Sequence, residues 1–284
     1  MHVLIPHERD EAAAQAGAAR LGRAIVVTSG KGGVGKTTTT ANLGTALAQR
    51  GASVVLIDAD VGLRNLDIVL GLESRVKHHL LDVLEGTATL DDALVPGKHS
   101  PTLRLLAAAQ AREKEDVDTE KMRALVLALR ERFDYVLIDS PAGIELGFKN
   151  AVAGADEAIV VCTPEVSAVR DVDRVVGLLG NAFKPQLVIN RLRPHLVKKG
   201  KMLSVDDVNA ILRLPLLGVI ADEPEIIVAT NRGEPLALRD DAPTGAAYRA
   251  IAARVAGEDV PAPMPAENRS FLERLGSIFG GKRA

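Results

Sequence analysis

Short runs of apolar residues alternate with longer amphipathic stretches from about residue 24 to about residue 256. Apolar runs bounded by polar and turn-forming residues predict buried strands, while apolar positions three or four residues apart predict helices. The predicted strands are Ala24–Thr28, Ser53–Asp58, Leu103–Ala107, Tyr135–Asp139, Glu157–Cys162, Gln186–Asn190 and Leu216–Ile220. The main helices predicted between them are Thr38–Arg50, Thr119–Arg132, Ser167–Gly180 and Ser204–Arg213. This alternation predicts the α/β class, with one doubly wound, mostly parallel sheet over residues 23–256.

The two ends of the chain depart from this pattern. Residues 1–22 precede the first strand and are predicted to be an N-terminal extension outside the domain. Residues 257–268 are rich in proline and small side chains, which predicts a linker that leaves the domain after Gly257. Residues 269–284 predict an amphipathic helix that suits an anionic membrane surface, with packing back onto the domain as the alternative. The residues expected to bind the membrane are Phe271, Leu272, Leu275, Ile278 and Phe279.

The most specific motif lies directly after the first strand. Residues 30–38 fit the phosphate-binding pattern G-x-x-x-x-G-K-[ST]. The glycines allow successive backbone N–H groups to face a triphosphate, and the next helix directs its positive end at the same place. Lys36 is expected to reach the β- and γ-phosphates and to be catalytic, and the Thr37 hydroxyl to bind Mg²⁺. The motif predicts a P-loop NTPase, with nucleotide contacts from Gly30, Lys31, Gly32, Gly33, Val34, Gly35, Lys36, Thr37 and Thr38.

Carboxylates follow two further strands. Asp58 ends one apolar run and Asp60 comes just after it, while Asp139 ends another. Ligands of doubly wound folds bind beyond the carboxyl ends of the strands, so these carboxylates are expected beside the γ-phosphate, where they can orient water or a metal ion. Capping of a turn is the structural alternative for each of them.

In this order, the segments resemble the MinD/ParA family of ATPases, which have a deviant Walker A motif. The resemblance rests on Lys-Gly-Gly-Val-Gly-Lys-Thr-Thr at residues 31–38, on Asp-Ala-Asp-Val-Gly-Leu-Arg-Asn-Leu-Asp at residues 58–67 and on Asp-Ser-Pro-Ala-Gly-Ile-Glu at residues 139–145. The continuation of the second segment favours the branch of the family that positions the division septum, as does the amphipathic tail.

The resemblance implies a role for each polar residue of these segments. Lys31 is expected to reach the nucleotide of a second subunit and to stabilise the transferred phosphoryl group, so that ATP controls homodimer formation. Asp60 is expected to position the attacking water, with Asp58 on the Mg²⁺ side. Asp139 would hold Mg²⁺ through a water molecule, and the Gly143 amide would sense the γ-phosphate.

A further pair of polar residues ends the strand predicted at residues 186–190. In the family this edge contacts the base, and Asn190 offers the donor and the acceptor that adenine requires. Arg191 can stack on the ring. Capping of the strand exit is the alternative for both residues.

The implied function is a Mg²⁺-dependent ATPase that binds the membrane as an ATP-bound dimer and helps to place the septum. The implied partners are a MinC-like division inhibitor and a MinE-like activator, with residues 164–174 as the candidate contact segment. The expected localisation is cytoplasmic, and peripheral on the inner face of the cell membrane in the ATP-bound state. A ParA-type DNA-partition ATPase and an FlhG-type regulator of flagellar number are the alternatives.

Composition changes this picture little. The formal net charge of −2 gives no overall attraction to nucleic acid, which is therefore not an expected partner. One basic cluster stands out, and it reads either as a solvated loop or as a contact for a polyanion. It consists of Arg191, Arg193, His195, Lys198, Lys199 and Lys201.

Overall fold

The computed structural model describes residues 21–110, 117–180 and 183–265. Their eight strands form one sheet in the order β3-β4-β2-β5-β1-β6-β7-β8. All neighbours are parallel except the short β3, which pairs antiparallel with β4 at one edge. The strands are β1 (Arg23–Thr28), β2 (Val54–Asp58), β3 (Val95–Pro96), β4 (Leu103–Leu106), β5 (Tyr135–Asp139), β6 (Glu157–Cys162), β7 (Gln186–Leu192) and β8 (Leu216–Ala221). The predicted α/β class and parallel sheet are confirmed.

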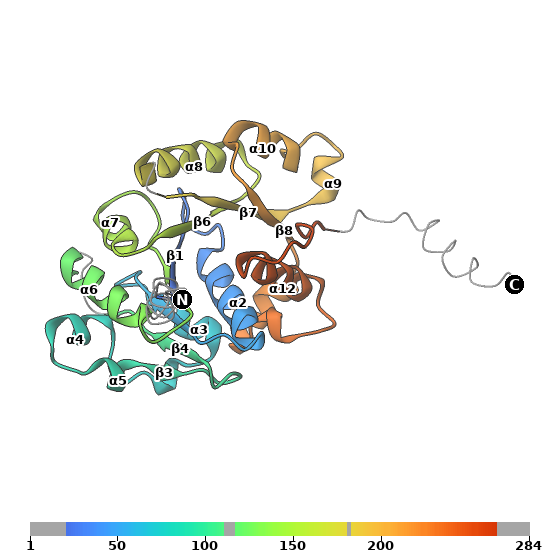
Figure 1. The fold of residues 1–284 in the computed structure, drawn as a ribbon. Helices are drawn as coiled ribbons and strands as arrows, with labels where there is room; N and C mark the ends of the chain where they lie inside the picture. The colour runs from blue at the N-terminus through green and yellow to red at the C-terminus, as the bar shows by residue number, and fades with distance from the viewer. Residues whose placement is uncertain (1–20, 111–116, 181–182, 266–284) are drawn as a thin grey trace, which may run out of the picture.

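Helices cover both faces of the sheet (Figure 1). One face carries α4 (Leu80–Glu85), α6 (Thr119–Arg130), α7 (Leu146–Val152), α8 (Val166–Leu179) and α10 (Val205–Leu212). The other carries α2 (Lys36–Gln49), α3 (Leu66–Leu70), α11 (Glu225–Arg232) and α12 (Pro243–Val255). Shorter elements are η1 (Glu73–Arg75), α5 (Leu90–Ala93), α9 (Pro194–Val197) and η4 (Leu236–Leu238).

The apolar runs read from the sequence are the buried strands of this sheet. Side chains alternate between the two faces of a strand, so Ala24 and Val26 enter one core, whereas Ile25 and Val27 enter the other. Strands covered on both faces need such continuous apolar runs. Among the described residues, no helix combines the length and the apolar character needed to cross a membrane.

The chain does not leave the domain at Gly257. After α12, residues 258–265 run along β8, where the Val219 amide donates to the carbonyl of Pro263 at 2.9 Å. Gly218 makes this approach possible, since a Cβ there would lie 2.6 Å from the Pro263 ring. At the start of the segment, Arg254 donates to the carbonyl of Val260. We call residues 258–265 the strap. The rest of the predicted linker and the predicted tail helix lie outside the described residues.

Candidate nucleotide site

The P-loop connects β1 to α2 at the carboxyl edge of the sheet. Gly33 and Gly35 have φ angles of +74° and +97°, which L side chains rarely adopt. Gly35 caps α2, and no acidic residue occupies the first turn of that helix. The unpaired N–H groups and the dipole of this 14-residue helix therefore favour an anion at its start.

Asn190 lies behind this loop. Its side-chain amide donates to the carbonyl of Val34 at 2.8 Å and its oxygen accepts the Arg191 amide at 2.9 Å. A Cβ on Gly35 would lie 2.2 Å from the same Asn190 amide. Asn190 is 4% exposed and therefore braces the P-loop in this structure. The predicted adenine contact of Asn190 stays a prediction.

The two strand-terminal carboxylates stand side by side. Asp58 and Asp139 are paired in the β2–β5 register and are each 1% exposed. Asp58 accepts three backbone N–H groups, from Asp60 at 3.0 Å and from Asn65 and Leu66 at 3.1 Å each. Asp58 thus orders the loop that carries Asp60, a role that comes in addition to the predicted one on the metal side.

Both buried carboxylates have raised pKa values. Burial, as the largest cause, raises the pKa of Asp58 to about 6. Burial and then the charge of Asp58 raise the pKa of Asp139 to about 8, against the lowering effects of the Thr37 hydroxyl and the Lys36 ammonium. The local positive charge therefore does not balance two ionised carboxylates. Carboxylate and hydroxyl oxygens are the ligands that Mg²⁺ prefers, so Thr37, Asp58 and Asp139 fit a bound Mg²⁺ ion.

A cavity of about 370 Å³ opens in front of the P-loop and collects most of the predicted residues. The predicted residues that line it are Gly32, Gly33, Gly35, Lys36, Thr37, Thr38, Asp60 and Arg191. The others lie around it: Lys31 is exposed on the loop, Val34 is buried under it, and Gly143 has a φ of +91° in the turn after β5. Gly30 packs against α8, where a Cβ would lie 2.3 Å from the backbone of Asp171.

The cavity also has walls that the motifs do not predict. They come from the loop after β2, from α3, from the turn after β5 and from α11. The added residues are Leu63, Asn65, Ile68, Val69, Ala142 and Thr230. Leu63 and Ile68 are 63% and 45% exposed. Two large apolar side chains are therefore exposed at the mouth of the cavity.

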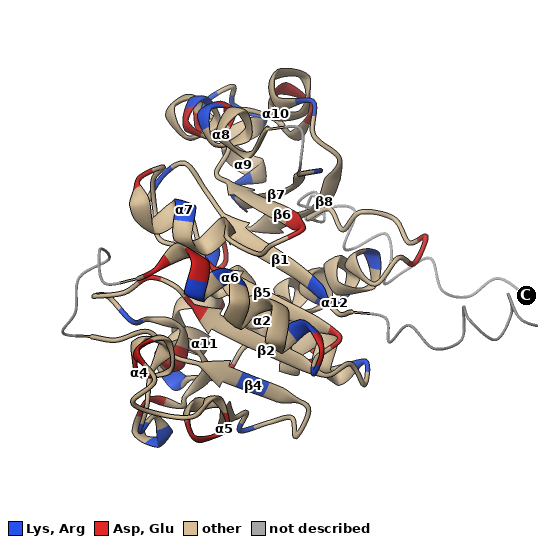
Figure 2. Ribbon diagram, turned by 60° about the vertical axis from the view of Figure 1, so that its left-hand side comes forward, with Lys and Arg blue, Asp and Glu red and all other residues tan. Residues whose placement is uncertain are grey.

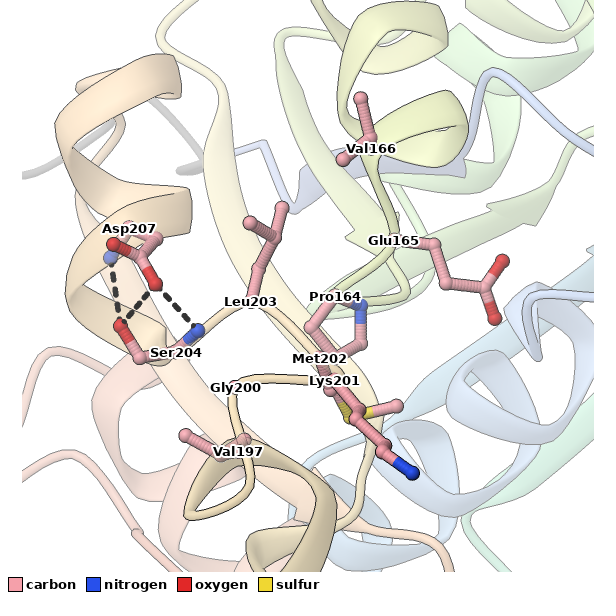
Figure 3. Close-up of a pocket in the computed structure, with 10 residues that line it drawn as sticks. All are labelled: Pro164, Glu165, Val166, Val197, Gly200, Lys201, Met202, Leu203, Ser204 and Asp207. Atoms are coloured by element: carbon pink, nitrogen blue, oxygen red, sulfur yellow. Dashed lines mark hydrogen bonds between the residues drawn. The ribbon is translucent and has the colours of Figure 1, made fainter.

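A second and larger cavity, about 480 Å³, lies between the start of α8 and the start of α10 (Figure 3). Val166, Val197 and Leu203 give it an apolar wall. The Asp207 carboxylate is already engaged with the amide and hydroxyl of Ser204. No P-loop or carboxylate residue of the nucleotide site reaches this cavity, so we place the chemistry in the smaller one. The predicted membrane residues lie outside the described part of the chain.

Comparisons with known proteins agree with this site. Residues 25–236 match the family model of the CobQ/CobB/MinD/ParA nucleotide binding domain. The septum site-determining protein MinD of Synechocystis is 55% identical over 90% of this chain and 97% of its own length. MinD of Bacillus subtilis is 51% identical over 92% of this chain and 99% of its own length.

Solved structures give the same result. The MinC:MinD cell division protein complex of Aquifex aeolicus matches with a TM-score of 0.79 and 48% identity, over 84% of this chain and 98% of that one. MinD of Pyrococcus horikoshii, complexed with Mg-ADP, matches with a TM-score of 0.76 and 32% identity, over 83% and 96%. The chain therefore belongs to the MinD/ParA family, among the septum site-determining MinD proteins.

Proposed function

We propose that this MinD-type ATPase positions the division septum by cycling between an ATP-bound dimer on the membrane and a released form. ATP and Mg²⁺ are its cofactors. The observation that carries the proposal is the nucleotide cavity, where the P-loop, the Asp60 loop and the buried carboxylate pair converge. The partition ATPase and the flagellar regulator are less supported, because relatives at 51–55% identity are septum site-determining proteins.

The polar residues in and around the cavity share the work of ATP hydrolysis. The P-loop amides and Lys36 would hold the phosphates, and Thr37 with Asp139 would hold Mg²⁺. Mg²⁺ bound there would supply neutralisation of the charge on the phosphate oxygens. Asp60 positions the attacking water, and Asp58 keeps Asp60 in place through its hydrogen bond to the Asp60 amide.

Lys31 serves a second copy of the chain. Its carbonyl accepts the Ser29 hydroxyl at 2.8 Å, which fixes the backbone, while the side chain stays exposed. Exposed apolar residues on the loop after β2, on α3 and on α11 support a dimer face at this edge. They are Leu63, Ile68, Ile227 and Val228, which are 45–66% exposed.

A MinC-like inhibitor and a MinE-like activator complete the cycle. The relative from Aquifex aeolicus forms a MinC:MinD complex, which supports the first partner. Residues 164–174 contain the start of α8, where Val166 is 60% exposed beside the second cavity. Because Gly30 packs against Asp171 of α8, a partner bound there is placed to sense the P-loop.

The test is cosedimentation of the full chain with vesicles of phosphatidylglycerol and phosphatidylcholine, in ATP-Mg²⁺ and in ADP. We expect binding with ATP and release with ADP. Lys31→Ala should abolish the ATP-dependent dimer in light scattering, and Asp60→Ala should trap the dimer with hydrolysis lost. Equal vesicle binding in both nucleotides, or none in either, would refute the membrane switch.

A further inference from the structure

We infer that the domain itself contacts anionic lipid headgroups through a basic surface beside the point where the described chain ends. This surface, called here the α9 basic surface, consists of Arg193, His195, Lys198, Lys199 and Lys201. The inference rests on the proposed membrane function and extends it, because it adds a second lipid contact to the predicted tail.

The charge of the chain segment that forms this surface is local and of one sign. Residues 186–205 contain five Lys or Arg and no Asp or Glu, in a chain whose net charge is −2. All five members of the surface are exposed. Arg193 is paired with Asp222 at 2.5 Å, which offsets part of this charge. Figure 2 shows a blue segment next to α9, which itself contains no Lys or Arg.

The backbone around α9 holds these lysines in a fixed turn. Lys198 donates its amide to Pro194 at 3.0 Å, Lys199 to Leu196 at 3.2 Å and Lys201 also to Leu196 at 2.9 Å. A charged surface held by the domain loses less conformational entropy on binding than a flexible basic tail does.

The strap brings the end of the described chain to the start of α9. Met264 and Pro265, the last described residues, share a cavity of about 260 Å³ with Pro194, the first residue of α9. Glu223 lines the same cavity, but its carboxylate accepts the Thr244 hydroxyl at 2.6 Å. The start of the predicted membrane helix, Arg269, follows Pro265 by four residues, which span at most about 14 Å.

The predicted start of the membrane helix can therefore lie no more than about 14 Å from the end of the strap beside α9. A basic residue near an anionic leaflet strengthens binding about fivefold, and the effect falls off within a Debye length. A tail anchored within this distance would hold the lysines where that attraction acts.

The double variant Lys198→Gln/Lys199→Gln tests the inference. With ATP-Mg²⁺ we expect its affinity for phosphatidylglycerol-containing vesicles to fall about tenfold or more, with a weaker dependence on salt. ATP hydrolysis in solution and ATP-dependent dimer formation should stay at the parental level, because neither lysine lines the nucleotide cavity. The matched control is Lys77→Gln/Lys98→Gln, which removes two exposed lysines near the opposite, β3–β4 edge and should bind vesicles as the parent does.

The outcomes separate the inference from the proposed function. If the parent chain binds no vesicles with ATP, the membrane function and this inference both fail. If the parent binds vesicles and the α9 variant binds them equally well, the inference alone is overturned. The same holds if the control variant is weakened as much as the α9 variant. A third outcome is that the α9 variant loses duplex-DNA binding, measured by fluorescence anisotropy, while its vesicle binding stays intact. That outcome would also overturn the inference and assign the surface to nucleic acid.

Discussion

Two buried carboxylates, Asp58 and Asp139, lie at the centre of the nucleotide site and make it unfavourable without a cation. An aspartate has a pKa near 3.8–3.9 in the unfolded chain, so a folded value of about 8 for Asp139 means that the folded protein binds this proton more tightly. The stability that this proton provides is complete below the unfolded pKa and is lost as the pH rises through the folded pKa. The site is therefore least stable, without Mg²⁺, at the pH at which it would bind Mg²⁺ best.

Asp139→Asn should remove this pH dependence. We compare the unfolding free energies of variant and parent in EDTA and without nucleotide. From about pH 5.5 to about pH 7.5, we expect the variant minus parent difference to rise by about 2 kcal/mol. Urea unfolding at the two pH values measures the difference. Asp134→Asn is the control, because the Ser53 hydroxyl and amide lower the pKa of Asp134 and this range lies above its titration. Equal pH dependence in the parent and in Asp139→Asn would contradict the argument.

The close approach of Asn190 to the P-loop gives a second prediction. Gly35→Ala should reduce the unfolding free energy by about 2–4 kcal/mol, because the new Cβ adds a collision with the Asn190 amide to the strain of a positive φ. Gly51→Ala carries the strain alone, since nothing lies within 4 Å of its Cβ at a φ of +90°, and should lose about 1 kcal/mol. Urea unfolding of both variants tests this. Similar losses would mean that Asn190 does not brace the loop.

Some residues of the nucleotide site can be predicted from the sequence, and others depend on how the chain folds. The P-loop and the strand-terminal aspartates are predictable because motif and strand order together place them at one edge of the sheet. The position of the Asn190 side chain is not, since it depends on an irregularity in β7 where Arg191 takes a φ of +58°. Leu63 and Ile68 carry no motif for a cavity wall, and only the fold shows them exposed at its mouth.

Among the helices and strands, too, some features follow from local sequence and others depend on the fold. β5 and β6 have the predicted bounds because apolar runs end sharply at polar residues. α2 begins two residues before its predicted start, as Gly35 itself is the cap. For the strap, the sequence predicts a free linker, since a composition of proline and small residues is typical of linkers. Its docking depends on the open edge of β8 and on the space at Gly218, which no local pattern reveals.

A double-mutant cycle across the strap measures this docking. Gly218→Ala should cost about 1–3 kcal/mol of unfolding free energy, since its Cβ would collide with Pro263 and Ile251. In a Pro263→Gly background the ring is gone and only the collision with Ile251 remains, so the cost should be smaller by about 0.5–1.5 kcal/mol. Urea unfolding of the four proteins gives the coupling. A coupling of zero would mean that the strap does not lie on β8 in solution.

At the scale of the whole molecule, the proposed dimer would join the weak membrane contacts of two chains. A helix of about ten residues is marginal in water, and a single short amphipathic segment binds a bilayer weakly. Two tails on one dimer raise the effective concentration of the second contact, which can strengthen binding by about two orders of magnitude or more. The nucleotide would then control membrane binding without touching the tail, by deciding how many tails the particle carries.

Dimers with one tail should therefore bind poorly. We expect a chain without residues 266–284, added in excess with ATP-Mg²⁺, to release the full-length chain from vesicles by forming mixed dimers. The deletion begins after the last described residue, so the contacts of the strap with β8 remain. The same truncated chain carrying Lys31→Ala is the control, since it should not form the dimer and should release nothing. Cosedimentation of a labelled full-length chain measures the bound fraction, and equal release by both truncated chains would mean that competition does not act through the dimer.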